Sequence, residues 1–253
     1  HEEIEDPQGA ATILSNIGVI YENHGNAIKA LAYFQRSLKI KEEVGDKRGM
    51  AADLNFIGGI YKDQGNTPVA LDYFYRSLSI YKEVNEKRGI GNLFQSIGIV
   101  YGDQGNHPKA LDYLLRSLTI REEIGDKNGI ATSLLNIGAT NNAQGKPEDA
   151  IKQCKSSLEI SEEIGAIKIQ KFACQCLYEA YKSMGQGNEA LKYMEFMRVA
   201  EDSLKAEETN KKLQQMEFAK QVYQDSVETF EKERLIELAH QEEVRKKDRT
   251  RNI

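Results

Sequence analysis

The stretch "LNFIGGIYKDQGNTPVALDYFYRSLSI", residues 54–80, decides the fold of this chain because it recurs. Copies of its pattern occupy residues 14–40, 94–120 and 134–160, so the period is 40 residues without insertions. A weaker fifth copy, "CLYEAYKSMGQGNEALKYMEFM", follows at residues 176–197. A fixed period of this length indicates a repeat protein, in which each unit packs on its neighbours.

Each copy predicts two helices joined by a tight turn. Leu54, Ile57 and Tyr61 are spaced i, i+3 and i+7, which places them on one face of the first helix. Gly65 is a C-cap candidate for that helix, and Pro68 suits the first turn of the next. The second helix carries an apolar stripe made of Ala70, Phe74, Ser77 and Leu78.

Glycines and an aspartate also mark where each pair begins. Gly45 is a C′ glycine and Asp46 an N-cap aspartate, so a helix is predicted to begin near residue 47. Gly125 and Asp126 repeat this signal. Within each pair, small residues at fixed positions are predicted to let two helices approach closely. These repeat-packing residues are Gly18, Gly58, Gly98, Gly138, Ala30, Ala70, Ala110, Ala150 and Ala190.

The spacing of Gly, Tyr, Gly, Ala and Phe over residues 11–200 resembles the tetratricopeptide repeat, whose usual period is 34 residues. The "NIG" at Asn16–Gly18 and the "GDKxG" signature resemble a long-repeat branch, similar to kinesin light chain, spindle-orientation adaptors and bacterial peptide-sensing regulators. The resemblance implies an all-α, right-handed superhelix of about five helix-turn-helix repeats. Tyr178 replaces the packing glycine in the fifth copy, as a terminal repeat allows.

We divide the chain into three parts. Residues 1–10 align with residues 41–50 and are interpreted as the tail of a truncated upstream repeat; residues 11–200 form the array. Residues 201–253 contain no glycine or proline and are predicted to form a long helix, a candidate coiled coil. A capping helix folded back on the fifth repeat, or disorder, are the alternatives for this last part.

A heptad-like seam in the last part predicts homodimerisation. The seam residues are Leu213, Met216, Tyr223, Val227 and Phe230, after which the register slips by one residue.

The same segment resembles the region that follows the repeats in membrane-anchored signal transducers of Bacteroidetes-type bacteria. That resemblance implies a sensor role, a membrane anchor after Ile253, an extracytoplasmic array and an output domain such as a nucleotide cyclase or histidine kinase. Lys246, Lys247, Arg249 and Arg251 would instead favour the cytoplasmic side. The alternative function is a soluble scaffold or adaptor with no membrane or output domain.

Composition and motifs exclude several classes of function. The net charge of -5 argues against nucleic acid or an anionic membrane as the main partner, and no apolar run reaches the roughly 20 residues that span a bilayer. The four histidines, which are His1, His24, His107 and His240, lie in separate segments. No catalytic, metal-binding or cofactor-binding motif is recognisable.

The three cysteines do not form a disulfide framework by their number or spacing. Cys174 and Cys176 are two residues apart and point in different directions on a helix. They and Cys154 are interpreted as buried small apolar residues rather than as a redox or metal pair.

A binding face is predicted on the first helix of each pair, because in tetratricopeptide arrays that helix lines the concave surface. Its positions are rich in amides and small residues, which can donate to and accept from a peptide backbone. We therefore expect a protein or peptide ligand in the groove. The candidate residues are Ser15, Asn16, Val19, Asn55, Phe56, Gln95, Ser96, Ile99, Asn136 and Gln175.

Overall fold

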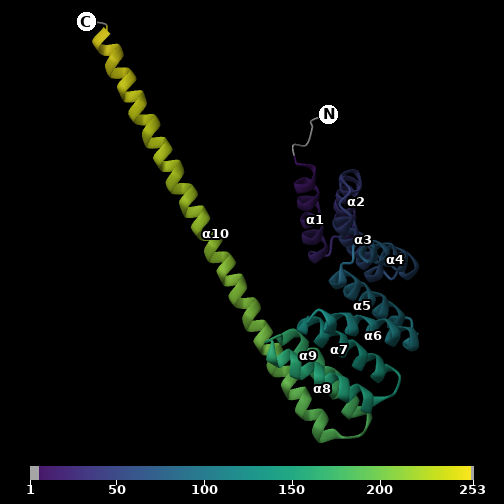
Figure 1. Ribbon diagram of the computed structural model, residues 1–253. Coiled ribbons are helices and arrows are strands. Elements are labelled where there is room, and N and C mark those ends of the chain that lie inside the picture. Colours follow the sequence, from purple (N-terminus) through teal and green to yellow (C-terminus); the bar gives the residue numbers. More distant parts are fainter. Residues whose placement is uncertain (1–5, 252–253) are drawn as a thin grey trace. The chain divides into compact units, whose positions relative to one another are not determined.

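The computed structural model describes residues 6–251, with side chains described through Ser226 and at Lys232 and Arg234. The described chain is helical, with ten helices joined by short turns (Figure 1). Their bounds are α1 Pro7–Asn23, α2 Ala27–Val44, α3 Lys47–Asp63, α4 Thr67–Glu83, α5 Lys87–Asp103, α6 His107–Glu123, α7 Lys127–Ala143, α8 Pro147–Glu163, α9 Ile167–Ser183 and α10 Gly187–Arg251. The predicted all-α class is confirmed.

The chain divides into two compact units, the first ending at Ala200 and the second beginning at Glu201. In the first unit the helices pair as predicted, α1 with α2 through α7 with α8. The fifth pair is α9 with the opening turns of α10, where Tyr181 stacks on Tyr193 with ring centroids 5.5 Å apart. In the second unit α10 continues as one helix to Arg251.

Caps place the helix starts where the sequence predicts them. The Gly49 N–H donates to Asp46 Oδ1 over 2.9 Å, and α3 begins at Lys47. Asp6 caps α1 in the same way, so residues 7–10 belong to the first turn of α1; residues 1–5 lie outside the described residues. Gly45 has a φ of 73°, the left-handed conformation that a C′ glycine supplies.

Asn85 occupies the turn position that Gly45, Gly125 and Gly165 hold elsewhere, with a φ of 53°. Left-handed backbone costs an ordinary L-residue roughly 1–2 kcal/mol, and asparagine less. We expect Asn85→Gly to raise the free energy of unfolding by about 0.5 kcal/mol, the relief of strain exceeding the entropy gained by the unfolded chain. Urea unfolding followed by circular dichroism measures this. Gly45→Asn is the matched reversal, and a loss of stability in Asn85→Gly would contradict the argument.

The small residues sit where helices meet. A Cβ on Gly58 would lie 2.7 Å from the Phe74 ring and 3.3 Å from the Ala70 carbonyl oxygen. Gly18 faces Phe34 and Gly98 faces Leu114 in the same manner, while Gly138 faces Cys154. The five alanines predicted to pack, Ala30, Ala70, Ala110, Ala150 and Ala190, are all buried.

In α2, α4, α6 and α8, one serine links the second helix of a pair to the first helix of the same pair. The Ser77 hydroxyl donates to the Ala51 carbonyl over 2.6 Å. The other serines do the same, in the pairs Ser37 with Ala11, Ser117 with Gly91 and Ser157 with Ala131. These bonds satisfy the hydroxyls inside an apolar contact, which an unpaired hydroxyl would weaken.

The interpretation of the cysteines is wrong for two of the three. Cys154 of α8 and Cys176 of α9 form a buried disulfide, with Cα atoms 6.3 Å apart. The pair stands where Phe34 and Phe56 stack in the first two repeats, at the same separation of 22 residues. The bond forms because successive repeats bring these positions together, which the spacing of cysteines along the chain does not reveal. Cys174 is free and buried, as expected.

Candidate functional site

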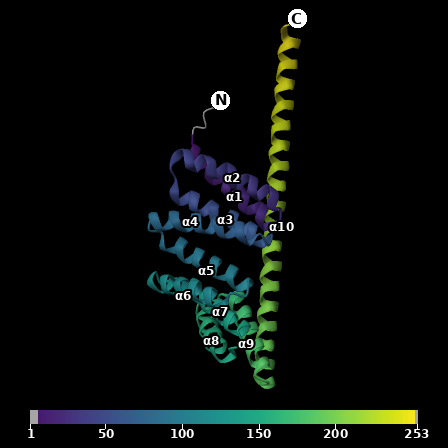
Figure 2. The same cartoon turned by 90° about the vertical axis from the view of Figure 1, so that its right-hand side faces the viewer.

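First helices form one continuous surface of the array. α1 contacts α3, α3 contacts α5, α5 contacts α7 and α7 contacts α9. Figures 1 and 2 show the pairs stacked in succession from α1 to α9. The ten candidate residues were predicted on this surface of first helices.

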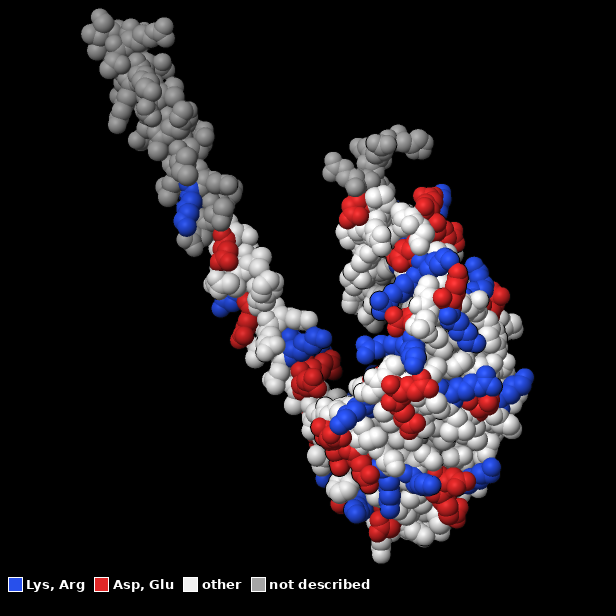
Figure 3. Space-filling view, viewed as in Figure 1, with Lys and Arg blue, Asp and Glu red and all other residues white. Residues whose placement is uncertain are grey.

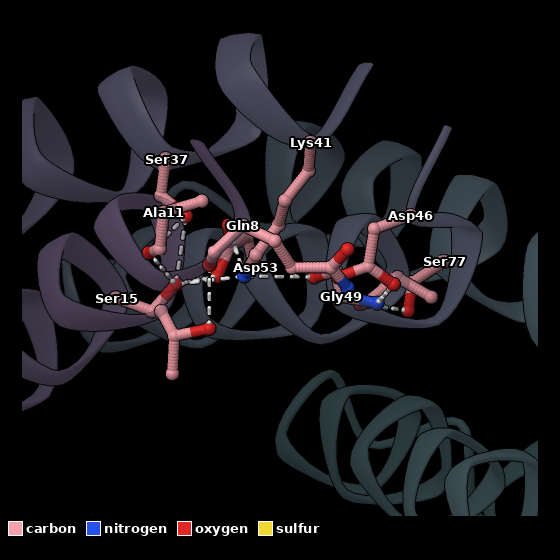
Figure 4. Close-up of polar contacts among 11 residues, drawn as sticks. Gln8, Ala11, Ser15, Ser37, Lys41, Asp46, Gly49, Asp53 and Ser77 are labelled. Carbon is pink, nitrogen blue, oxygen red and sulfur yellow. Dashed lines mark hydrogen bonds and ion pairs between the residues drawn. The ribbon is translucent and has the colours of Figure 1, made fainter. Parts of the chain in front are cut away.

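Ser15 belongs to a buried ionic network between repeats (Figure 4). Lys41 Nζ lies 2.9 Å from Asp53 Oδ2, and the two side chains are 6% and 1% exposed. Ser15 Oγ donates to Asp53 Oδ1 over 2.7 Å and accepts from Lys41 Nζ over 2.7 Å. Buried charges require such pairing. Ser15 therefore stabilises the joint of α1, α2 and α3.

Gln95 is engaged in a similar way two repeats later. Its Oε1 accepts a hydrogen bond from Arg121 Nη2 over 2.9 Å, and Asn92 Oδ1 accepts another over 3.0 Å. Arg121 also forms an ion pair with Asp126. Burial lowers the pKa of Arg121, and the neighbouring Asp126 carboxylate opposes that shift. Gln95 and Ser15 thus use their hydrogen bonds within the array.

The other candidates are distributed along the inner side. Phe56 is half-buried and stacks on Phe34 with centroids 5.1 Å apart. Gln175 is exposed and donates from Nε2 to Glu179 Oε1 over 3.1 Å. Asn16 is exposed, whereas Val19, Asn55 and Ser96 are half-buried. These residues line one side of the array without converging on a point.

Ile99 and Asn136 do converge, in a hollow of about 210 Å³ between α5, α6 and α7. Small residues make the room, because Gly102, Ala139 and Ala143 stand on its walls. Of the residues that line the hollow, only these two were among the ten candidates predicted from the sequence. The complete lining is Ile99, Gly102, Asp103, His107, Leu114, Asn136, Ala139, Thr140 and Ala143.

The hollow combines apolar walls with a few polar groups. Ile99 and Leu114 supply aliphatic surface, and Asn136 and Asp103 supply an amide and a carboxylate. His107 begins α6 beside the turn, and its Nδ1 is buried with no hydrogen-bond partner. Apolar walls with a few placed polar groups are typical of ligand sites in proteins. The sequence signal for this hollow is the set of small residues Gly102, Ala139 and Ala143 in repeats three and four.

Acidic side chains mark the ends of the first helices. Glu22 of α1 is partly buried, and burial raises its pKa, with the nearby Asp63 carboxylate adding to the shift. Over the face of the first unit in Figure 3, both signs of charge are interspersed. The face shown is therefore not a basic surface of the kind that binds a phosphate backbone.

Neither a metal site nor a membrane span is found among the residues that the structure describes. No group of three or more His, Cys, Asp or Glu side chains is arranged to hold a metal ion there. No helix in that part of the chain has the length and hydropathy of a membrane span.

Helix pairs repeated in register, with their first helices lining one surface, define a helical-repeat protein of the kind that binds other proteins. The tetratricopeptide repeat model matches residues 9–83 and 90–163, more than half of the chain. The chain belongs to the tetratricopeptide repeat family and is a protein-interaction module. A comparison with curated protein sequences gave no match.

Solved structures share this fold at low sequence identity. A Rap protein complexed with competence and sporulation factor has a TM-score of 0.68 at 20% identity, over 76% of this chain and 54% of that one. The repeats of a putative kinesin light chain from Podosopora anserina have a TM-score of 0.61 at 14% identity, over 79% of this chain and 99% of that one. A signal transduction ATPase with a tetratricopeptide repeat sensor, from Pyrococcus horikoshii, has a TM-score of 0.66 at 19% identity. The match covers 79% of this chain and 31% of that one.

Proposed function

We propose that the concave face binds a segment of another protein or a peptide, as the sensor module of a bacterial signal-transduction protein. The observation that carries this proposal is the hollow between α5, α6 and α7, on the inner side of the array. There Asn136 offers an amide above aliphatic walls, so one ligand side chain can be anchored while the neighbouring first helices contact the flanking backbone.

The descriptions of two similar structures support the sensor role. One is a Rap protein complexed with competence and sporulation factor, and the other contains a tetratricopeptide repeat described as a sensor. The Cys154–Cys176 disulfide supports an oxidising compartment for the array, since such bonds persist there. An output domain and a membrane anchor after Ile253 belong to the same proposal through the resemblance of residues 201–253 to transducers.

Self-association through residues 201–253 is the second part of the proposal. Leu213, Met216 and Tyr223 are all more than half exposed on α10, and apolar side chains of this size favour a partner surface. Phe218 and Val222 are exposed as well, so the apolar residues extend beyond the predicted seam. The side chains of Val227 and Phe230 lie outside the described residues.

Filling the hollow tests the binding proposal. Peptides would be selected from a random twelve-residue display library on the immobilised chain, and the enriched peptides tested against Ala139→Arg. Ala139 is exposed on the wall of the hollow, so arginine occupies the space without entering the core. We expect affinity to fall at least about tenfold, a loss of about 1.4 kcal/mol. Failure to enrich any peptide would contradict the proposal.

A further inference from the structure

The first helix of each repeat carries a polar residue near its end, except in repeat three, where the residue is Gly102. The equivalents of Gly102, at intervals of 40 residues, are Glu22, Lys62, Asn142 and Lys182. Gly102 lies on the wall of the hollow between α5, α6 and α7 and presents no side chain to it. The contacts of its equivalents show what that space holds in other repeats.

In two other repeats this polar side chain reaches the first helix of the next repeat. Glu22 Oε1 lies 3.9 Å from the point where a Cβ on Gly59 of α3 would stand. Asn142 Nδ2 donates to the carbonyl oxygen of Cys176, on α9, over 2.9 Å. The side chain at this position therefore fills the space between successive first helices.

The hollow occupies the same space in repeat three. Ala139 and Asn136 of α7 both line it. By the 40-residue period these two residues correspond to Gly59 and Cys176. Gly102 leaves the space between α5 and α7 open, because it has no side chain to place there. A ligand side chain that enters the hollow therefore takes the place that the chain's own side chain takes in the first and fourth repeats.

The charge of the hollow indicates which kind of side chain enters. Asp103 lines it, and no lysine or arginine does. In repeat two the positions of Gly102 and Asp103 are held by Lys62 and Asp63. Lys62 Nζ lies 3.1 Å from Asp63 Oδ1, whereas Asp103 forms no ion pair among the described residues. Repeat three thus keeps the aspartate of this pair and lacks the lysine.

The walls suit the rest of a basic side chain. Ile99 and Leu114 supply aliphatic surface for methylene groups, which lysine and arginine bury while their charged ends stay in water. Asp103 is exposed, so it can pair with such an end at the rim of the hollow. His107 Nδ1 is a further polar atom of the lining that has no hydrogen-bond partner among the described residues. An imidazole nitrogen without a proton accepts a hydrogen bond.

We propose that the hollow binds a lysine or arginine side chain of the ligand, with the charged end paired to Asp103. This inference rests on the proposed binding of a protein segment or peptide and names the chemistry of the residue that anchors it. The basic residue of the ligand takes the role that Lys62 has beside Asp63, and its methylene groups cover Ile99 and Ala139.

Peptides selected on the immobilised wild-type chain from a random twelve-residue display library test this assignment. We expect a lysine or arginine at one shared position of the enriched sequences. Calorimetric titration would compare one such peptide with its copy carrying methionine there, which keeps an unbranched stem without the charge. Asp103→Asn should weaken the basic peptide at least about threefold more than the methionine peptide, because the interaction removed is an ion pair.

Asp63→Asn is the matched control for that experiment. Asp63 is exposed at the equivalent position of repeat two and already pairs with Lys62. We therefore expect Asp63→Asn to bind the basic peptide as the wild type does.

Gly102→Lys tests the same site from the protein's side, because it restores the lysine of repeat two. A Cβ on Gly102 would lie 3.8 Å from Ala110 Cβ, an ordinary contact, so the array stays folded, which circular dichroism verifies. We expect the basic peptide to lose at least about tenfold in affinity, since the new lysine fills the hollow and pairs with Asp103. Thr119→Lys adds the same charge at an exposed position outside the hollow and should leave the affinity unchanged.

The outcomes distinguish failure of this inference from failure of the proposed function. If the enriched peptides bind Ala139→Arg weakly but share no basic residue, or if Asp103→Asn weakens both peptides equally, peptide binding in the hollow stands and the basic anchor is overturned. Equal affinity of Gly102→Lys and the wild type for the basic peptide overturns it as well. If no peptide is enriched, the proposed function and this inference both fail.

Discussion

Replacing Asp53 by alanine is expected to lower the free energy of unfolding by about 3–5 kcal/mol, because it leaves the Lys41 ammonium buried without its partner. Ser15 loses an acceptor in the same change, since its hydroxyl donates to Asp53 Oδ1. The network joins α1, α2 and α3, so its loss opens the contact between the first two repeats. Urea unfolding followed by circular dichroism at 222 nm, the usual helix signal, measures the change.

The chain supplies two controls for that experiment. Lys47 and Glu83 form an ion pair with both side chains more than half exposed, and Glu83→Ala should have an effect well below that of Asp53→Ala. The double variant Lys41→Tyr with Asp53→Leu copies the Tyr81 and Leu93 pair of the next repeat, and should regain most of the lost stability. A loss in Asp53→Ala no larger than in Glu83→Ala would show that the network does not hold the joint.

Reduction of the Cys154–Cys176 disulfide is expected to destabilise the array by about 3 kcal/mol, the loss of constraint on a loop of this length in the unfolded chain. The affected joint is that of α8 and α9, the last two repeats. Unfolding curves with and without reductant measure the difference. The variant Cys154→Ala with Cys176→Ala should respond to reductant no further, which separates the disulfide from other effects.

Cys174 should take no part in this chemistry. Burial, together with the Glu162 carboxylate, raises the pKa of Cys174 to about 11. The thiol is therefore protonated at neutral pH, and only the thiolate attacks a disulfide or an alkylating reagent. Slow alkylation of the native chain at pH 7, with rapid alkylation after unfolding, is the expected pattern.

For the disulfide itself, equal reductant sensitivity of the wild type and of the Cys154→Ala, Cys176→Ala variant would contradict the assigned pair.

Local signals were sufficient for the fold because each helix boundary depends on neighbours in sequence. Gly45 and Asp46 determine where α2 ends and α3 begins, and the 40-residue period then copies that result along the chain. The turn at Asn85 was the exception, where asparagine holds a conformation that glycine supplies elsewhere.

The site was harder to predict because it depends on contacts between repeats. Ser15 and Gln95 have the chemistry of a peptide-binding stripe, but Lys41 and Arg121 on the adjoining second helices engage them. The sequence does hold a clue, since Lys41 shares its stripe position with Tyr81. A buried lysine requires an acid nearby, and Asp53 is where the next repeat has Leu93.

The disulfide was missed for the same reason. Cys154 and Cys176 are 22 residues apart, on α8 and α9 of different repeats, so only the packing of these two helices brings them together. The stacked Phe34 and Phe56 at the equivalent positions would have identified the pair once the repeats were aligned in three dimensions. Contacts of this class follow from the period only after the superhelix is known.

The most direct measurement of the central claim is the affinity of one selected peptide for three proteins: the wild type, Ala139→Arg and Thr119→Arg. Thr119 is exposed on the second helix α6 and is not part of the hollow between α5, α6 and α7. A concave binding site predicts a loss of at least about tenfold in Ala139→Arg and no change in Thr119→Arg. Equal affinity for Ala139→Arg and the wild type would show that the ligand does not use this hollow.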